Sequence, residues 1–185
     1  MDNLEVEVLL NKEGLQFSRV QAKHYKLTFS MENPNIILSD IIDFNLIKLI
    51  YDLNVDIYEK VILDKLNDNE AIATILIKHF FEDVGLPQRF SFLHIKKYIE
   101  EKRIIFVSQS IRSHKPEGMP EEAELMAIND LTSVCDVITP HKINFTFNLI
   151  FDPIMYIPPF AEKVVGLILF KIFKRVKQFI ENVRL

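Results

Sequence analysis

The sequence predicts an α+β fold: a curved antiparallel β-sheet wrapped around a long C-terminal α-helix, with short helices after the first strands. Three observations lead to this prediction. Apolar and polar residues alternate over several short segments, turn residues separate these segments, and a wide apolar stripe at helical spacing closes the chain. The length of 185 residues, with 49% apolar and 26% charged residues, is typical of one globular domain, so we expect a single domain over residues 1–185.

The first predicted strand covers residues 24–31, where Tyr25, Leu27 and Phe29 alternate with polar side chains. The residues before it read as a polar opening, and we assign no strand to them. Residues 32–35, Glu-Asn-Pro-Asn, combine a turn signal with a helix-start signal. In residues 36–54 the apolar positions recur in steps of three and four, which predicts one or two short helices.

Three pairs of strands are predicted next, each pair joined by a short polar or charged turn. They are residues 57–66 with 71–78, residues 90–99 with 104–111, and residues 125–138 with 142–151. Residues 112–124 are rich in Pro and charge and poor in large apolar side chains, which predicts a loop between the second pair and the third.

The last predicted element is a helix that begins at Pro158-Pro159 and runs to the C-terminus. At about 24 residues it is about 36 Å long, the longest helix in the protein. Its apolar stripe is wide, and a sheet that curls around the helix is the arrangement that covers such a stripe best.

Charge and cysteine content argue against several classes of protein. The net charge of −4 gives no long-range attraction for phosphate backbones, so we expect no nucleic-acid partner. The single cysteine, Cys135, cannot form an intramolecular disulfide, and no His/Cys spacing resembles a zinc site, so we expect a reducing compartment and no metal. The acidic opening residues do not fit a cleaved presequence, and no apolar run reaches the ~20 residues of a spanning helix. A cytoplasmic location follows as the expectation.

Signals for catalysis are weak. Ser108 and Ser110 lack a nucleophile-elbow context, Glu121-Glu122 lie in a predicted loop, and no glycine-rich phosphate-binding string occurs. We therefore expect no enzyme activity and no cofactor.

Six short strings occur in the order and spacing of one known family. They are Tyr51-Asp52 with Asn54-Val55, Leu86-Pro87-Gln88-Arg89-Phe90, the strand at 104–111, Val137-Ile138-Thr139-Pro140, the strand that runs into Asp152-Pro153, and Ile157-Pro158-Pro159-Phe160. Over most of its length the chain thus resembles the START (steroidogenic acute regulatory protein-related lipid transfer) family. The resemblance implies a helix-grip fold that binds a phospholipid, sterol or fatty acid in a cavity between sheet and helix.

Two departures from the family bear on the ligand. The chain has no Trp, and Tyr51 stands where the family commonly has one. Gln88-Arg89 stand where the family favours Arg-Asp, and that arginine can meet the polar head of a ligand. Either Gln88 or, after a slip of one residue, Arg89 takes this position; the sequence leaves both alternatives open.

The resemblance and the strand pattern together define the expected site. His94 shares the strand parity of Gln88, Phe90 and Phe92, so it is a candidate for a polar ligand contact. The expected lipid-binding residues are Tyr51, Gln88, Arg89, Phe90, Phe92, His94, Phe145, Phe147, Phe160, Val164 and Ile168.

Transfer would also need a gate and transient contact with an organelle membrane. We expect the closing helix and the loop at 112–124 to open there, with basic residues of the helix attracted to anionic lipids. These residues are Lys163, Lys171, Lys174, Arg175 and Lys177.

The alternative is a non-enzymatic accessory or structural subunit, in which the same fold has filled its cavity and binds protein partners. A roomy apolar cavity would favour lipid transfer, whereas a filled interior with a large exposed apolar patch would favour assembly.

Overall fold

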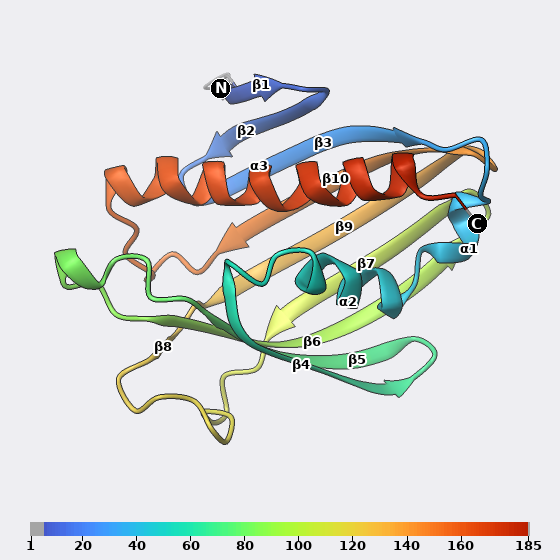
Figure 1. Cartoon of the computed structure of the whole chain (residues 1–185). Helices are drawn as coiled ribbons and strands as arrows, with labels where there is room; N and C mark the ends of the chain where they lie inside the picture. The colour runs from blue at the N-terminus through green and yellow to red at the C-terminus, as the bar shows by residue number, and fades with distance from the viewer. Residues whose placement is uncertain (1–5, 185) are drawn as a thin grey trace, which may run out of the picture.

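One antiparallel sheet curves around a long helix in the computed structural model, which describes residues 6–184 (Figure 1). The strand order is β1-β2-β3-β10-β9-β7-β6-β5-β4, and the short β8 adds to β6 in parallel. The strands are β1 (Glu7–Lys12), β2 (Leu15–Gln21), β3 (His24–Glu32), β4 (Tyr58–Asn67), β5 (Glu70–Ile77), β6 (Arg89–Glu100), β7 (Arg103–Ser110), β8 (Glu124–Leu125), β9 (Ile128–Thr139) and β10 (Lys142–Phe151).

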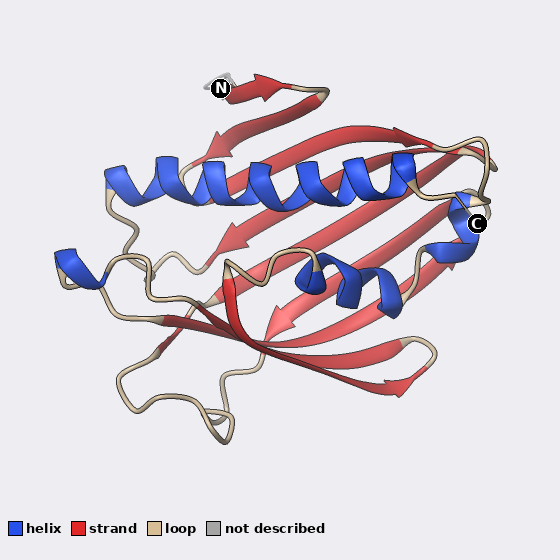
Figure 2. Ribbon diagram, viewed as in Figure 1, coloured by secondary structure: helices blue, strands red, loops and turns tan. Residues whose placement is uncertain are grey.

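The α-helices lie on the concave face of this sheet, and a 3₁₀ turn projects beyond one end of it (Figure 2). They are α1 (Leu38–Ile41), α2 (Phe44–Asp52), the single 3₁₀ turn η1 (Glu82–Val84) and α3 (Pro159–Asn182). The Asp43 side chain caps α2 by accepting hydrogen bonds from the backbone N–H groups of Asn45 and Leu46. Pro159 suits the first position of α3. A backbone N–H at that position has no acceptor within the helix, so proline loses no hydrogen bond by lacking one.

Most predicted elements are confirmed, and α3 has the expected 24 residues. The prediction that no strand precedes residue 24 was wrong, because β1 and β2 form a hairpin there that extends the sheet beyond β3. The third predicted pair also differs, since β9 begins at Ile128 and Leu125 belongs to β8. The single-domain prediction for residues 1–185 stays a prediction, and residues 1–5 and 185 lie outside the described range.

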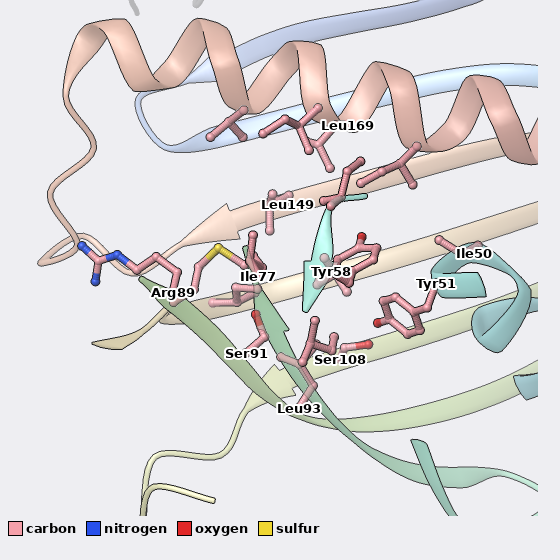
Figure 3. A pocket seen from close by; sticks show the side chains of 18 of the residues that line it. Ile50, Tyr51, Tyr58, Ile77, Arg89, Ser91, Leu93, Ser108, Leu149 and Leu169 are labelled. Carbon is pink, nitrogen blue, oxygen red and sulfur yellow. The ribbon is translucent and has the colours of Figure 1, made fainter. Parts of the chain in front are cut away.

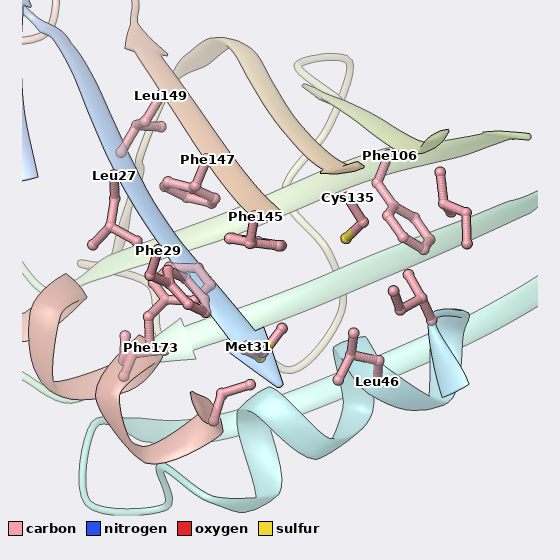
Figure 4. Packing of buried hydrophobic residues seen from close by; sticks show 14 of the residues in the cluster. Leu27, Phe29, Met31, Leu46, Phe106, Cys135, Phe145, Phe147, Leu149 and Phe173 are labelled. Carbon is pink, nitrogen blue, oxygen red and sulfur yellow. The ribbon is translucent and has the colours of Figure 1, made fainter. Parts of the chain in front are cut away.

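The main core lies between the concave face and the helices (Figure 4). Phe173 of α3 packs on Phe145 and Phe147 of β10, with ring centroids 5.3 and 5.0 Å apart. The end of α3 is fixed by the fully buried Asn33, whose amide donates hydrogen bonds to the carbonyls of Ile180 (2.6 Å) and Val183 (2.8 Å). The helix is therefore held against the sheet by both apolar packing and a buried polar clamp.

A second, smaller cluster comprises Leu76, Phe90, Phe92 and Ala123. Phe90 and Phe92 have the opposite strand parity to Ser91 and Leu93, so they lie on the convex face of the sheet. The segment at 112–124 covers this cluster. It is a loop, as predicted, but it lies on the face of the sheet away from α3.

Candidate functional site

The concave face, α2 and α3 line a cavity of about 260 Å³ that is partly open to the surface. This volume is many times the ~10–15 Å³ that one water molecule needs. Its wall is overwhelmingly apolar. The helices contribute apolar side chains (Leu46, Ile47, Ile50, Val165, Ile168, Leu169, Ile172 and Phe173), and so does the sheet (Ile75, Ile77, Leu93, Ile95, Phe106, Ile128, Leu131, Phe145, Phe147, Leu149 and Phe151). Met126, between β8 and β9, adds a thioether side chain.

The alternation of side chains along each strand determines which residues form the floor of the cavity. The lining residues of β6 are the odd-numbered Arg89, Ser91, Leu93 and Ile95, and those of β9 and β10 are also odd-numbered from residue 131 onward. The even-numbered residues of β6 point to the convex face. The sheet can thus present one apolar face to the cavity while the other carries polar residues or the second cluster.

A few hydroxyl groups interrupt the apolar wall (Figure 3). Tyr51 of α2 and Tyr58 at the start of β4 stack edge to face with ring centroids 5.0 Å apart. Burial raises the pKa of both phenols, so both remain neutral donors. Ser91, Ser108 and Ser133 add three hydroxyls from the sheet.

Cys135 also lines the cavity, on β9. Burial raises the pKa of its thiol to about 12, with a smaller contribution from the neighbouring Asp136 carboxylate. The thiolate is the reactive form of cysteine, so this side chain behaves as a small apolar residue and not as a nucleophile. Between residues 6 and 184, no group of three or more His, Cys, Asp or Glu side chains could hold a metal ion.

Gln88 and Arg89 both lie at one end of the cavity. The Gln88 amide, only 6% exposed, donates hydrogen bonds to Glu59 Oε2 (2.7 Å) and to the Ile77 carbonyl (2.9 Å). The Arg89 guanidinium pairs with Glu124 Oε2 at 2.7 Å, and Figure 3 shows it directed away from Tyr51 and Tyr58. Neither residue presents an unpaired positive charge to the interior.

Six of the eleven expected lipid-binding residues come together in the cavity wall: Tyr51, Gln88, Arg89, Phe145, Phe147 and Ile168. Their role in lipid binding stays a prediction. The other five do not line this cavity. Phe90 and Phe92 belong to the convex-face cluster, and His94, on the same face, has its Nε2 3.5 Å from Glu70 Oε2. Gln88 lies before the start of β6, so it does not share the alternation of that strand. The prediction grouped Phe90, Phe92 and His94 with Gln88 by alternation, and it therefore assigned them to the cavity face although they lie on the convex face.

The remaining two lie on α3. Phe160 is half exposed, and its ring packs edge-on against Phe81 at 6.0 Å. Val164 is one position from Val165, which does line the cavity. A helix turns by about 100° per residue, so a one-residue difference moves a side chain off the concave side.

Most of the basic residues expected to contact a membrane pair with carboxylates of the protein itself. Lys171 and Arg175 contact Asp56 at 2.6 and 2.5 Å, and these hydrogen bonds, first Arg175 and then Lys171, lower the pKa of that carboxyl. Lys174 contacts Glu13 at 2.6 Å, and Lys177 contacts Glu181 at 2.5 Å. The pairs with Asp56 and Glu13 tie α3 to the α2–β4 loop and to the β1–β2 turn, the Lys177–Glu181 pair lies within α3, and together they compensate the charge of the helix.

The sequence analysis missed Tyr58, Ser91 and Ser108 as cavity residues. The alternation of β6 would have found Ser91 once Leu93 and Ile95 were recognised as its inward face. Tyr58 has no such signal, because it begins the edge strand β4, of which it is the one residue that lines the cavity.

This architecture, an unclosed curved sheet gripping a C-terminal helix, is the helix-grip fold of START domains, so the sequence resemblance is confirmed at the level of the fold. The human StarD13 (DLC2) lipid transfer and protein localization domain matches with a TM-score of 0.70 and 13% identity, covering 96% of this chain and 90% of that chain. Human StAR-related lipid transfer protein 5 matches with a TM-score of 0.70 and 10% identity, covering 97% of this chain and 88% of that one.

A bacterial structure shares the fold as well. The STAR-related lipid transfer protein (fragment 25–204) from Xanthomonas axonopodis has a TM-score of 0.67 and 13% identity, with 95% of this chain and 98% of that chain covered. No family model matches the sequence, and no curated protein matches it. Among the described helices, none is long and apolar enough to cross a membrane.

Proposed function

We propose that this protein binds one lipid in the cavity between sheet and α3 and carries it between membranes, without catalysis. The observation that carries the proposal is the apolar cavity of about 260 Å³ between the sheet and the helices. Each methylene that moves from water into such a space stabilises the complex by about 0.8 kcal/mol, so an acyl chain or sterol binds tightly without covalent chemistry. The named lipid-transfer domains support the fold, and the cavity supports the function.

The cavity also weighs against the accessory-subunit alternative. That alternative expects a filled interior, in which the many Phe side chains occupy the space beneath the helix. Here Phe145, Phe147 and Phe173 pack together at one side and leave a cavity beside them. Lipid binding is therefore the function we favour.

We place the gate at the end of the cavity where α3 begins. The segment between β5 and β6 contributes Phe80, Phe81 and Pro87 to the wall there, and α3 contributes Val165 and Ile168. The Phe81–Phe160 ring contact links this segment to the first turn of α3. Separation of these two rings would open the cavity, whereas the loop at 112–124 lies on the convex face and has no place in this gate.

The same end exposes apolar side chains, which supports membrane contact there. We call this set the mouth rim: Phe80 (44% exposed), Val84 (59%), Ile154 (86%), Tyr156 (71%) and Phe160 (50%). In Figure 1, η1 and the chain leading into α3 lie at this same end of the molecule. Insertion of the rim into a bilayer surface would bring the gate directly to the lipid.

The experiment is native mass spectrometry of the purified protein, followed by a fluorescent-lipid transfer assay between vesicles. Ser133→Leu adds a larger apolar side chain to the cavity floor, so we expect it to reduce lipid loading and transfer at least about tenfold while the fold is retained. Ser30→Leu, at an exposed position of β3, is the matched control and should transfer like the wild type. A protein that stays empty after incubation with mixed lipid vesicles would contradict the proposal.

A further inference from the structure

The charged side chains that line the cavity stand at its mouth. Lys78 directly follows β5 and Arg89 begins β6, so both flank the segment that forms the gate. Arg89 is already paired with Glu124. Deeper in the cavity, the polar side-chain groups contributed by residues 6–184 are neutral hydroxyls, apart from the protonated Cys135 thiol.

These hydroxyls have no partner within the part of the chain that the structure describes. Among residues 6–184, no side-chain or backbone group hydrogen-bonds to the hydroxyls of Tyr51, Tyr58 and Ser108, and the same holds for Ser91 and Ser133 in the wall of the same cavity. None of the fully buried side-chain N and O atoms in this part of the chain lacks a hydrogen-bond partner. These wall hydroxyls therefore keep accessible surface, which is available to a ligand in the cavity that they line.

This arrangement discriminates between two ways of filling the cavity. A lipid tail pressed against the hydroxyls would bury them without partners, which is unfavourable for each group. An anionic head group at the same place would lose its hydration without meeting a positive charge, which is far more unfavourable. An uncharged polar group avoids both penalties, because phenol and serine hydroxyls donate and accept hydrogen bonds.

We propose that the cavity selects an uncharged lipid whose hydroxyl group is held by one or more of the wall hydroxyls of Tyr51, Tyr58 and Ser108, with the apolar body extending toward the mouth. The inference rests on the proposed function and narrows its ligand class. Gln88 is consistent with this inference: its amide is neutral, and it already donates hydrogen bonds to Glu59 and to the Ile77 carbonyl, so it offers no positive charge to an anionic head group.

The test compares three probes with one C18 chain length: oleyl alcohol, oleyl phosphate and 1-octadecene. Each is titrated into delipidated protein below its aggregation concentration, and the dissociation constant is measured by calorimetry. We expect oleyl alcohol to bind at least about tenfold tighter than oleyl phosphate and about threefold to tenfold tighter than 1-octadecene, the latter being the effect of one or two net neutral hydrogen bonds.

Two variants locate the hydroxyl contact. Tyr51→Phe and Tyr58→Phe keep the ring and remove only the oxygen, so at least one of them should weaken oleyl alcohol binding about threefold to tenfold, and neither should change 1-octadecene binding. The control is Tyr98→Phe, at a half-exposed tyrosine of β6 outside the cavity wall, which should change neither.

The outcomes separate the inference from the proposed function. Oleyl phosphate binding as tightly as the alcohol, or alcohol binding that is unchanged in both cavity variants, overturns the inference and leaves lipid binding standing. Binding of none of the three probes overturns both. If one variant does not fold, as judged by circular dichroism, the probe series on the wild type and the other variant still decide the question.

Discussion

Gly166 is the point where α3 comes close to β2. A Cβ built at this position would lie 2.7 Å from Cε1 of Phe17, whose buried ring stacks on Tyr25 with centroids 5.7 Å apart. A ring held on both sides cannot move aside easily, so the absence of a side chain at Gly166 sets the distance between helix and sheet.

We predict that Gly166→Ala destabilises the protein by about 1 kcal/mol. Overpacking costs about 1–3 kcal/mol, and the better helix propensity of Ala returns about 1 kcal/mol of it. Urea unfolding followed by circular dichroism measures the difference. Phe17→Leu in the Gly166→Ala background should recover part of the loss, because it removes the contact. An increase in stability for Gly166→Ala alone would show that the ring yields at no cost.

For single residues, the sequence predicted which kinds of side chain line the cavity better than it predicted the face of the sheet to which each side chain points. Tyr51, Phe145 and Phe147 were expected in the cavity wall and lie there, whereas His94 faces the convex side and approaches Glu70. His94 was assigned to the wrong face because the alternation was counted from Gln88, whereas β6 begins one residue later, at Arg89. Composition is visible in a single sequence, but the residue at which a strand begins depends on pairing with distant partners.

Among the elements, the first hairpin is the one that sequence patterning missed. β1 forms an edge of the sheet, and its side chains are almost all exposed, so no buried face imposes an alternating pattern on it. α3 is the opposite case, since its wide buried stripe and its proline start are both local signals. What the local signals of α3 do not reveal is the clamp at its end, because Asn33 lies 147 residues before Ile180.

We predict that Asn33→Ala lowers the free energy of unfolding by about 2–3 kcal/mol, since it leaves the Ile180 and Val183 carbonyls without their donor. Asn33→Asp keeps the size but replaces the donor with a carboxylate, so it should be at least as destabilising. Asn35→Ala removes a neighbouring exposed side chain and should change stability little. The measurement is urea unfolding by circular dichroism, and a stable Asn33→Asp variant would contradict the role of Asn33 as donor.

For the whole molecule, the sequence indicated the order of elements but not the space between them. The same alternation on β6, β9 and β10 suits a filled interior or a hollow one, because it specifies which side chains point inward and not how closely they meet. The sequence also does not reveal that the hydroxyls of Tyr51, Tyr58 and Ser108 line one cavity, because these residues come from three different elements, α2, β4 and β7. A cavity is a property of packing, so only the assembled sheet and helix reveal it.

The orientation of the whole molecule on a membrane is the last prediction. The mouth rim is apolar, whereas Lys171, Lys174, Arg175 and Lys177 of α3 are compensated by neighbouring carboxylates. We therefore expect docking to depend on apolar insertion, with little dependence on salt or on anionic lipid. The double variant Ile154→Ser/Tyr156→Ser should reduce binding to phosphatidylcholine vesicles at least about tenfold, because fully burying one such apolar side chain contributes about 1.5–3 kcal/mol.

Two further variants separate the mouth rim from the basic residues in the same vesicle sedimentation assay. Leu66→Ser/Ile99→Ser removes two exposed apolar side chains near the β4–β5 and β6–β7 turns, away from the mouth, and should bind vesicles like the wild type. Lys163→Glu reverses an exposed charge on α3 and should also bind normally, since the rim alone supplies the attachment. Loss of binding in Lys163→Glu, together with wild-type binding in Ile154→Ser/Tyr156→Ser, would instead place the membrane on the basic residues of α3, because charge would then determine attachment and apolar insertion would not.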